Sequence, residues 1–140
     1  MKKITLCCIA ILLTGGLLGF GPAQVHVAYS TAQIEVFVRE VFANEADALV
    51  LKSDSSRLQL ITGFLNRIEI LYQPELKGKK FKLLSSVKLQ DKYNPGLLRD
   101  VVYNPATFNP LKYHFPMASQ TKEVYRFDQT DYLIIIHPVK

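Results

Sequence analysis

The segment that most constrains the fold lies near the end of the chain. Its sequence, "DYLIIIHP", is apolar from Tyr132 to Ile136, and Pro138 ends it. A strand with apolar side chains on both faces is expected to be covered on both faces. The preceding "KEVYRF" is joined to it by the polar "DQTD", which predicts a β-hairpin. The C-terminal segment is therefore predicted to be a central strand of a sheet, not a disposable extension.

A helix is predicted from Thr31 to about Ala43. Ser30 and Gln33 have the spacing of a capping box, in which the two side chains bond to each other's backbone amides. Apolar residues then recur at helical spacing and form one stripe, which needs a partner surface. The stripe consists of Ile34, Phe37, Val38, Val41 and Phe42.

A second helix is predicted from about Ser55 to Asn66, after an "SDSS" cap. Arg67–Tyr72 is compatible with more helix or with a strand, and Lys79–Leu89 is predicted to be a strand. Helices followed by strands predict an α+β domain, with two N-terminal helices packed on a C-terminal antiparallel sheet. This element order resembles cystatin-like and NTF2-like folds, in which a curved sheet cups a helix. Such an analogy implies no function.

Residues 1–30 have the layout of a secretory signal peptide. Lys2 and Lys3 precede a largely apolar run from Ile4 to Phe20, and small residues then allow cleavage after Ala23 or after Ser30. The alternative is an uncleaved anchor, because the run approaches the roughly 20 residues that span a bilayer. We expect an exported protein, periplasmic or extracellular, with residues 31–140 as one domain.

Removal of this leader would change the chemistry that is available to the chain. Both cysteines, Cys7 and Cys8, lie within the leader, so the mature chain would have no disulfide and no thiolate. The basic residues would fall from 17 to 15, against 12 acidic ones. That excess is mild, and its one cluster, Lys77–Lys82, is typical of a solvated turn. A nucleic-acid partner is not expected, because it requires a broader basic face.

An aromatic–Asn–Pro triplet occurs three times in "KYNPGLLRDVVYNPATFNPLKYHFP". An Asn side chain accepts hydrogen bonds from amides ahead of it and Pro fixes φ, so each triplet predicts a turn, pinned to the core by its aromatic residue. A segment this long and aromatic could instead be a recognition loop. That alternative predicts binding residues at Tyr103, Asn104, Phe108, Asn109, Tyr113, His114 and Phe115.

Four segments carry a resemblance to a known family: "LLSSVKL", "KYNP", "FNPLKYHF" and "YRFDQTDYLIIIHP". In these segments the chain resembles an uncharacterised family of small exported bacterial proteins, over roughly Ser56 to Pro138. The resemblance implies a single domain that continues to the C-terminus. It implies no activity, ligand or catalytic residue.

Catalytic and metal-binding patterns have little support in the sequence. Ser85 and Ser86 lack a Gly-x-Ser-x-Gly context, and only residue type would join them to His114 and Asp100. We expect no cofactor and no metal site. The leading hypothesis is a non-catalytic binding module at the cell envelope, with an envelope protein or a glycan as partner. The alternatives are a small hydrolase and a carrier that holds an apolar ligand among Phe37, Phe42, Phe64 and Leu65.

Overall fold

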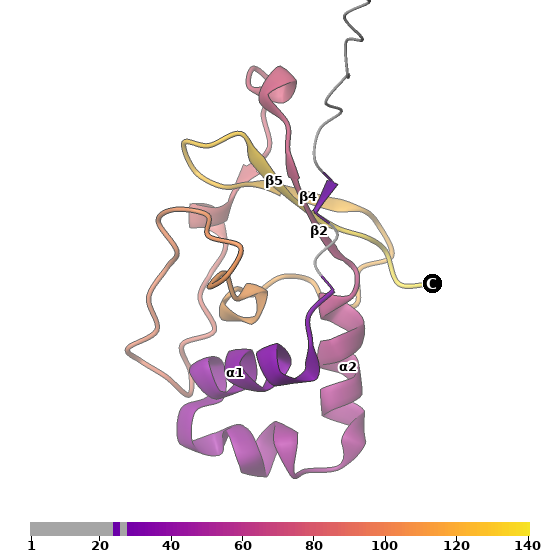
Figure 1. The fold of residues 1–140 in the computed structure, drawn as a ribbon, viewed down its shortest axis with the longest axis vertical. Helices are drawn as coiled ribbons and strands as arrows, with labels where there is room; N and C mark the ends of the chain where they lie inside the picture. Colours follow the sequence, from indigo (N-terminus) through magenta and orange to yellow (C-terminus); the bar gives the residue numbers. More distant parts are fainter. Residues whose placement is uncertain (1–23, 26–27) are drawn as a thin grey trace, which may run out of the picture.

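A computed structural model describes residues 24–25 and 28–140; the predicted leader, as far as Ala23, lies outside the described residues. The predicted α+β class is confirmed, in a single small domain with two α-helices and a mixed sheet (Figure 1). The strand order in the sheet is β1-β2-β5-β4-β3. The elements are β1 (Gln24–Val25), α1 (Thr31–Phe42), α2 (Ser55–Leu65), β2 (Ile68–Tyr72), β3 (Lys82–Leu83), β4 (Glu123–Arg126) and β5 (Tyr132–Ile136).

The C-terminal hairpin is the centre of the sheet, as predicted. Strand β5 pairs antiparallel with β4 on one side and with β2 on the other, and Ile134 lies opposite both Tyr125 and Ile70. Residues 133–136 are all buried, because both faces of β5 are covered. The prediction of an entirely antiparallel sheet was wrong, because β3 runs parallel to β4.

The predicted strand Lys79–Leu89 is also corrected. Only two of its residues form a strand, β3, and a 3-10 turn, η4 (Leu84–Ser86), follows this strand at once. The Ser85 amide donates to the Asp128 carboxylate at 2.9 Å, and the Arg99 guanidinium donates to two backbone carbonyls of this segment at 3.1 and 2.6 Å. These side chains satisfy backbone groups that a longer strand would pair with a neighbouring strand.

Both helices begin where local capping predicts. Ser30 and Gln33 form the complete capping box of α1, and the Asp54 side chain accepts the Ser56 amide at the start of α2. The open question of Arg67–Tyr72 is settled, because strand β2 begins at Ile68, after a turn of two residues that follows α2. No helix within residues 28–140 is both long and apolar enough to cross a membrane.

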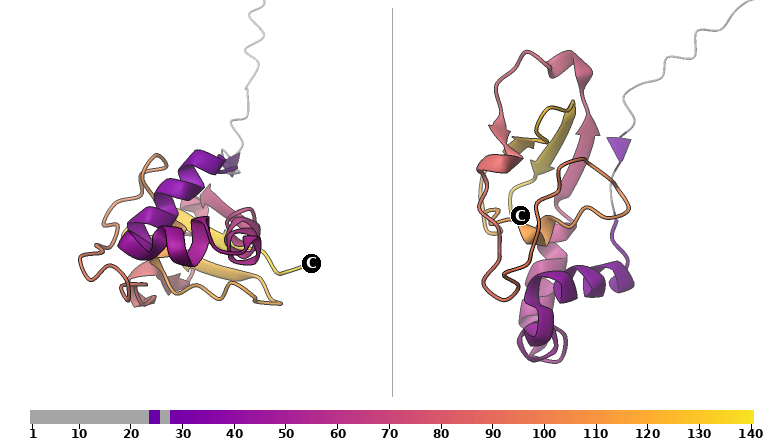
Figure 2. Two further views of the ribbon diagram at one scale, coloured as in Figure 1. Left: turned by 90° about the horizontal axis from the view of Figure 1, so that it is seen from below. Right: turned by 90° about the vertical axis from the view of Figure 1, so that its left-hand side faces the viewer.

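The helices lie beyond one end of the sheet instead of covering one of its faces, which corrects the predicted packing (Figures 1 and 2). The 3-10 turn η5 (Pro110–Lys112), in the aromatic segment, lies between α1 and the sheet and contacts α1. The hydrophobic core therefore joins three layers: the helices, the aromatic segment and the sheet.

Candidate functional site

The three aromatic–Asn–Pro triplets share one local device, and it confirms the predicted turn chemistry. In each triplet the Asn side-chain oxygen accepts the backbone amide two residues ahead. The donor–acceptor distance is 3.2 Å for Asn94, 2.9 Å for Asn104 and 3.0 Å for Asn109. Each Asn therefore closes a turn around the proline that follows it.

Two of the triplets also hold the C-terminal half of α1. The buried Asn109 amide donates to the Phe37 carbonyl at 3.0 Å and to the Glu40 carboxylate at 2.9 Å. The Asn94 amide donates to the Glu40 carbonyl at 2.8 Å, and the ring of Tyr93 stacks on Phe42. These bonds connect segments far apart in the sequence, so the triplets fasten the aromatic segment to the helix.

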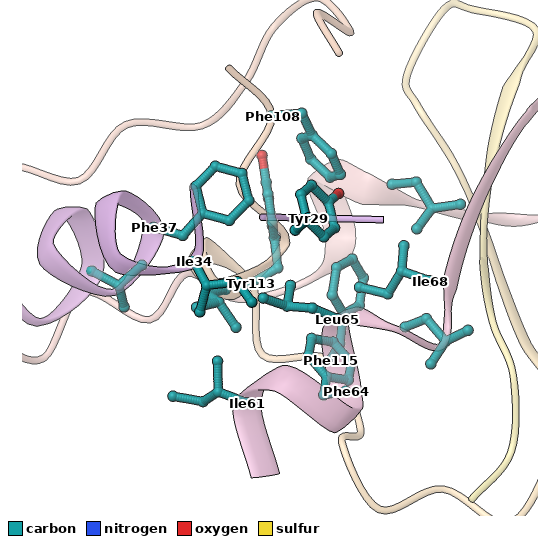
Figure 3. Packing of buried hydrophobic residues seen from close by; sticks show 14 of the residues in the cluster. Tyr29, Ile34, Phe37, Ile61, Phe64, Leu65, Ile68, Phe108, Tyr113 and Phe115 are labelled. Atoms are coloured by element: carbon teal, nitrogen blue, oxygen red, sulfur yellow. The ribbon is translucent and has the colours of Figure 1, made fainter. Parts of the chain in front are cut away.

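The aromatic side chains of this segment pack inward. Phe108 meets Phe127 edge to face, with ring centroids 5.0 Å apart, and it also contacts Tyr113. Phe115 lies 4.8 Å from Tyr125, centroid to centroid. Figure 3 shows Phe108, Tyr113 and Phe115 in one cluster with residues from both helices. They are core residues that link the helices to the sheet.

The seven predicted binding residues therefore do not form one exposed face. Phe108, Asn109, Tyr113 and Phe115 are buried, Tyr103 is half-buried, and only Asn104 and His114 are exposed. This arrangement matches the interpretation of the triplets as turns pinned to the core. A partner could reach four of the seven side chains only after local unfolding, so an exposed contact surface has to be sought elsewhere.

Such a surface lies in the loop between the first two triplets. Leu98, Val101 and Val102 are 77%, 83% and 72% exposed, and we call these three side chains the apolar rim. The loop belongs to the long irregular stretch that runs along one side of the molecule (Figure 1). Sequence reasoning missed this surface, because the two aliphatic pairs of "GLLRDVV" stand at i, i+1, i+4 and i+5, a spacing typical of the buried face of a helix.

A pocket of about 390 Å³ adjoins the apolar rim, and we call it the rim pocket. Val101 and Val102 contribute to its wall, together with η4 and the turn of the β4–β5 hairpin. Its volume lies within the range of roughly 300–1,000 Å³ that is typical of binding sites. The lining residues are Leu84, Ser85, Arg99, Asp100, Val101, Val102, Tyr113, Asp128, Gln129 and Thr130.

An ionic network fixes one wall of the rim pocket. The Asp100 carboxylate accepts hydrogen bonds from Lys112 Nζ at 2.9 Å and from Tyr113 Oη at 2.8 Å. Lys112 is itself buried, and its second anionic neighbour is Glu40 at 3.7 Å. Burial raises the pKa of Tyr113 above its ordinary value of 10.0, so the phenol stays protonated and donates to Asp100.

Three other polar side chains of the pocket are also engaged within the protein. The Arg99 guanidinium is held by backbone carbonyls, Asp128 accepts the Ser85 amide, and the Thr130 hydroxyl donates to the Phe127 carbonyl at 3.0 Å. A site for a small polar ligand needs several convergent polar groups that are free to bind it. The rim pocket is better suited to an apolar group, which requires no hydrogen bond.

The catalytic and carrier alternatives gain little from this geometry. Asp100 is occupied by Lys112 and Tyr113, and within residues 28–140 no hydrogen bond joins the His114 ring to a serine. No group of three or more potential metal ligands occurs in the part of the chain that the structure describes. Of the predicted carrier lining, three residues belong to the packed core and Phe42 is half-buried; the three are Phe37, Phe64 and Leu65.

Comparison of the chain with protein-family models, curated proteins and solved structures gives no significant match. The resemblance to an exported bacterial family therefore stays a prediction.

We expect the protein to lose stability as the pH rises above about 10. The ordinary pKa of a tyrosine is 10.0, and burial raises the pKa of both Tyr113 and Tyr29 above this value. Above pH 10 these tyrosines lose their protons in the unfolded chain but keep them in the folded state. Their contribution to the free energy of unfolding is therefore complete below pH 10 and is lost progressively as the pH rises above it. Above pH 10, each of the two tyrosines should lower the free energy of unfolding by about 1.4 kcal/mol per pH unit.

Urea unfolding between about pH 8 and pH 11 measures this loss, and ultraviolet absorbance of tyrosinate reports the ionisation itself. In the Tyr113→Phe variant the slope above pH 10 should be shallower. A free energy of unfolding that stays constant to pH 11 would contradict the expectation.

Proposed function

We propose that the protein is an exported, non-catalytic module that binds another protein at the cell envelope through the apolar rim and the rim pocket. The observation that carries the proposal is the exposure of Leu98, Val101 and Val102, each above 70%, beside a pocket of about 390 Å³. Export is supported by the basic, apolar and small-residue layout of residues 1–30.

The chemistry of the rim favours a partner that offers an apolar surface. Three aliphatic side chains within five residues expose apolar area to water, and clustered exposure of this kind is typical of interaction sites. The adjoining pocket supplies a concave site, in which an apolar side chain of the partner would lose contact with water. The Asp100 network already holds the loop in place, so binding would not carry the entropic cost of ordering it.

A protein is favoured over a glycan. Sugars are commonly recognised through exposed aromatic faces and free hydrogen-bonding groups, whereas Phe108, Tyr113 and Phe115 are buried here. Most polar side chains of the rim pocket are engaged in hydrogen bonds within the protein. The rim is aliphatic, and aliphatic contact is the ordinary chemistry of protein–protein interface cores.

Site-specific photocrosslinking in the exporting host tests this proposal. A photoreactive residue replaces Val102 in the full chain, and a matched chain carries it at Val36, an aliphatic residue of α1 that is 62% exposed. We expect a discrete crosslinked protein from position 102 and none from position 36. Adding Val101→Asp to the first chain should reduce that crosslink by roughly tenfold or more.

The control for folding is the melting temperature of the Val101→Asp variant, which should change little because the side chain is exposed. Equal crosslinking from positions 36 and 102, or no crosslinked protein from position 102, would overturn the proposal. Crosslinks to a glycan would show that the partner is a glycan and not a protein. A bound small molecule seen by native mass spectrometry and released on denaturation would favour the carrier alternative.

A further inference from the structure

We infer that the leader is removed between Ala23 and Gln24, and not after Ser30. This inference rests on the proposed export. The sequence offers both positions, since small residues precede each of them. The structure favours the first position, because Gln24–Val25 and Tyr29–Ser30 take part in the fold and would be lost by cleavage after Ser30.

The first observation is strand β1. Gln24 lies opposite Leu71 and Val25 opposite Ile70, in antiparallel pairing with β2. Strand β2 therefore has a neighbour on each side, β1 and β5. Cleavage after Ser30 would leave β2 as an edge strand with unpaired backbone groups, the arrangement that invites pairing with other chains.

The second observation is Tyr29, which belongs to the hydrophobic core. Its side chain is buried, and its ring meets Phe37 edge to face at 5.1 Å between centroids. Figure 3 shows it among Phe37, Phe108 and Tyr113. A chain that began at Thr31 would lack this ring and would leave a space beside the aromatic segment.

The third observation is the N-terminal cap of α1. Ser30 Oγ accepts the Gln33 amide at 3.2 Å, and the Gln33 side chain accepts the Ser30 amide at 3.0 Å. Cleavage after Ser30 would remove both bonds and place a charged amino group at the positive end of the helix dipole. Cleavage after Ala23 keeps the strand, the ring and the cap.

The test is the N-terminus of the exported protein. The full chain is expressed in an exporting bacterium with a C-terminal affinity tag, the envelope and cytoplasmic fractions are separated, and intact masses are measured. We expect an envelope species that begins at Gln24. Cyclisation of Gln24, in which the α-amino nitrogen attacks the side-chain amide carbon and ammonia leaves, would lower that mass by one ammonia and support the same assignment.

Two matched variants sharpen the result. Ala23→Lys places a long cation where the peptidase requires a small residue, so it should reduce the processed species by roughly tenfold or more. Ser30→Lys should still be processed to Gln24. An exported chain that begins at Thr31, or processing blocked by Ser30→Lys but not by Ala23→Lys, would overturn the assignment. A chain that begins at Met1 and stays in the cytoplasm would overturn the proposed export, and with it this inference.

Discussion

Replacing Phe108 with alanine is expected to lower the free energy of unfolding by about 3–5 kcal/mol, the usual cost of removing a buried phenylalanine. Its ring is buried against Phe127 and Tyr113, at the point where the aromatic segment meets the sheet. The loss should appear as a drop of roughly 10–20 °C in melting temperature for a domain of this size.

Two matched variants show whether burial is the cause. Phe108→Leu keeps most of the volume and should cost less than about 1.5 kcal/mol. Val102→Ala removes an exposed side chain and should change stability by no more than about 0.5 kcal/mol. Urea unfolding of the four proteins gives the comparison. A Phe108→Ala protein as stable as the parent would contradict the packed core and restore Phe108 as a candidate contact residue.

Local signals in the sequence predicted much of the fold. The capping box of Ser30 and Gln33 involves residues three apart, so it can be recognised without tertiary information. The apolar run of β5 requires cover on both faces wherever it lies, and this predicted a central strand. Each signal depends on the residues of one short segment, and both predictions were confirmed.

The predictions that failed depended on partners distant in sequence. Lys79–Leu89 alternates like a strand, but Arg99 and Asp128 take up its backbone groups and end β3 after two residues. The composition of the aromatic segment could not decide between a surface and a core. That outcome depends on α1, whose Phe37 carbonyl receives the Asn109 amide.

The apolar rim could not be predicted for a different reason. Apolar residues are expected inside, so Leu98, Val101 and Val102 would be assigned to the core by residue type alone. Their exposure follows from the turns on either side, since Asn94 holds one end of the loop against α1 and Tyr103 packs the other end against Phe108. Only the assembled structure shows that the side chains between them face water.

Replacing Asp100 with alanine is expected to lower the free energy of unfolding by about 3 kcal/mol or more. The Lys112 and Asp100 side chains are 6% and 14% exposed, and their charged atoms lie 2.9 Å apart. Removing the carboxylate leaves the ammonium group buried, and among residues 28–140 only Glu40, at 3.7 Å, still forms an ion pair with it. Truncating one partner of a buried pair is costly because the other charge stays out of water.

A double-mutant cycle with Lys112→Met separates this effect from a simple loss of packing. Methionine keeps much of the volume of lysine without its charge, so the double variant should be less destabilised than the sum of the single variants by about 1–3 kcal/mol. Asp91→Ala, a change at an exposed aspartate, should be nearly neutral. Additive effects would mean that the two charges do not interact in solution. Coupling would mean that the network holds Asp100 in place, and with it Val101, the next residue of the apolar rim.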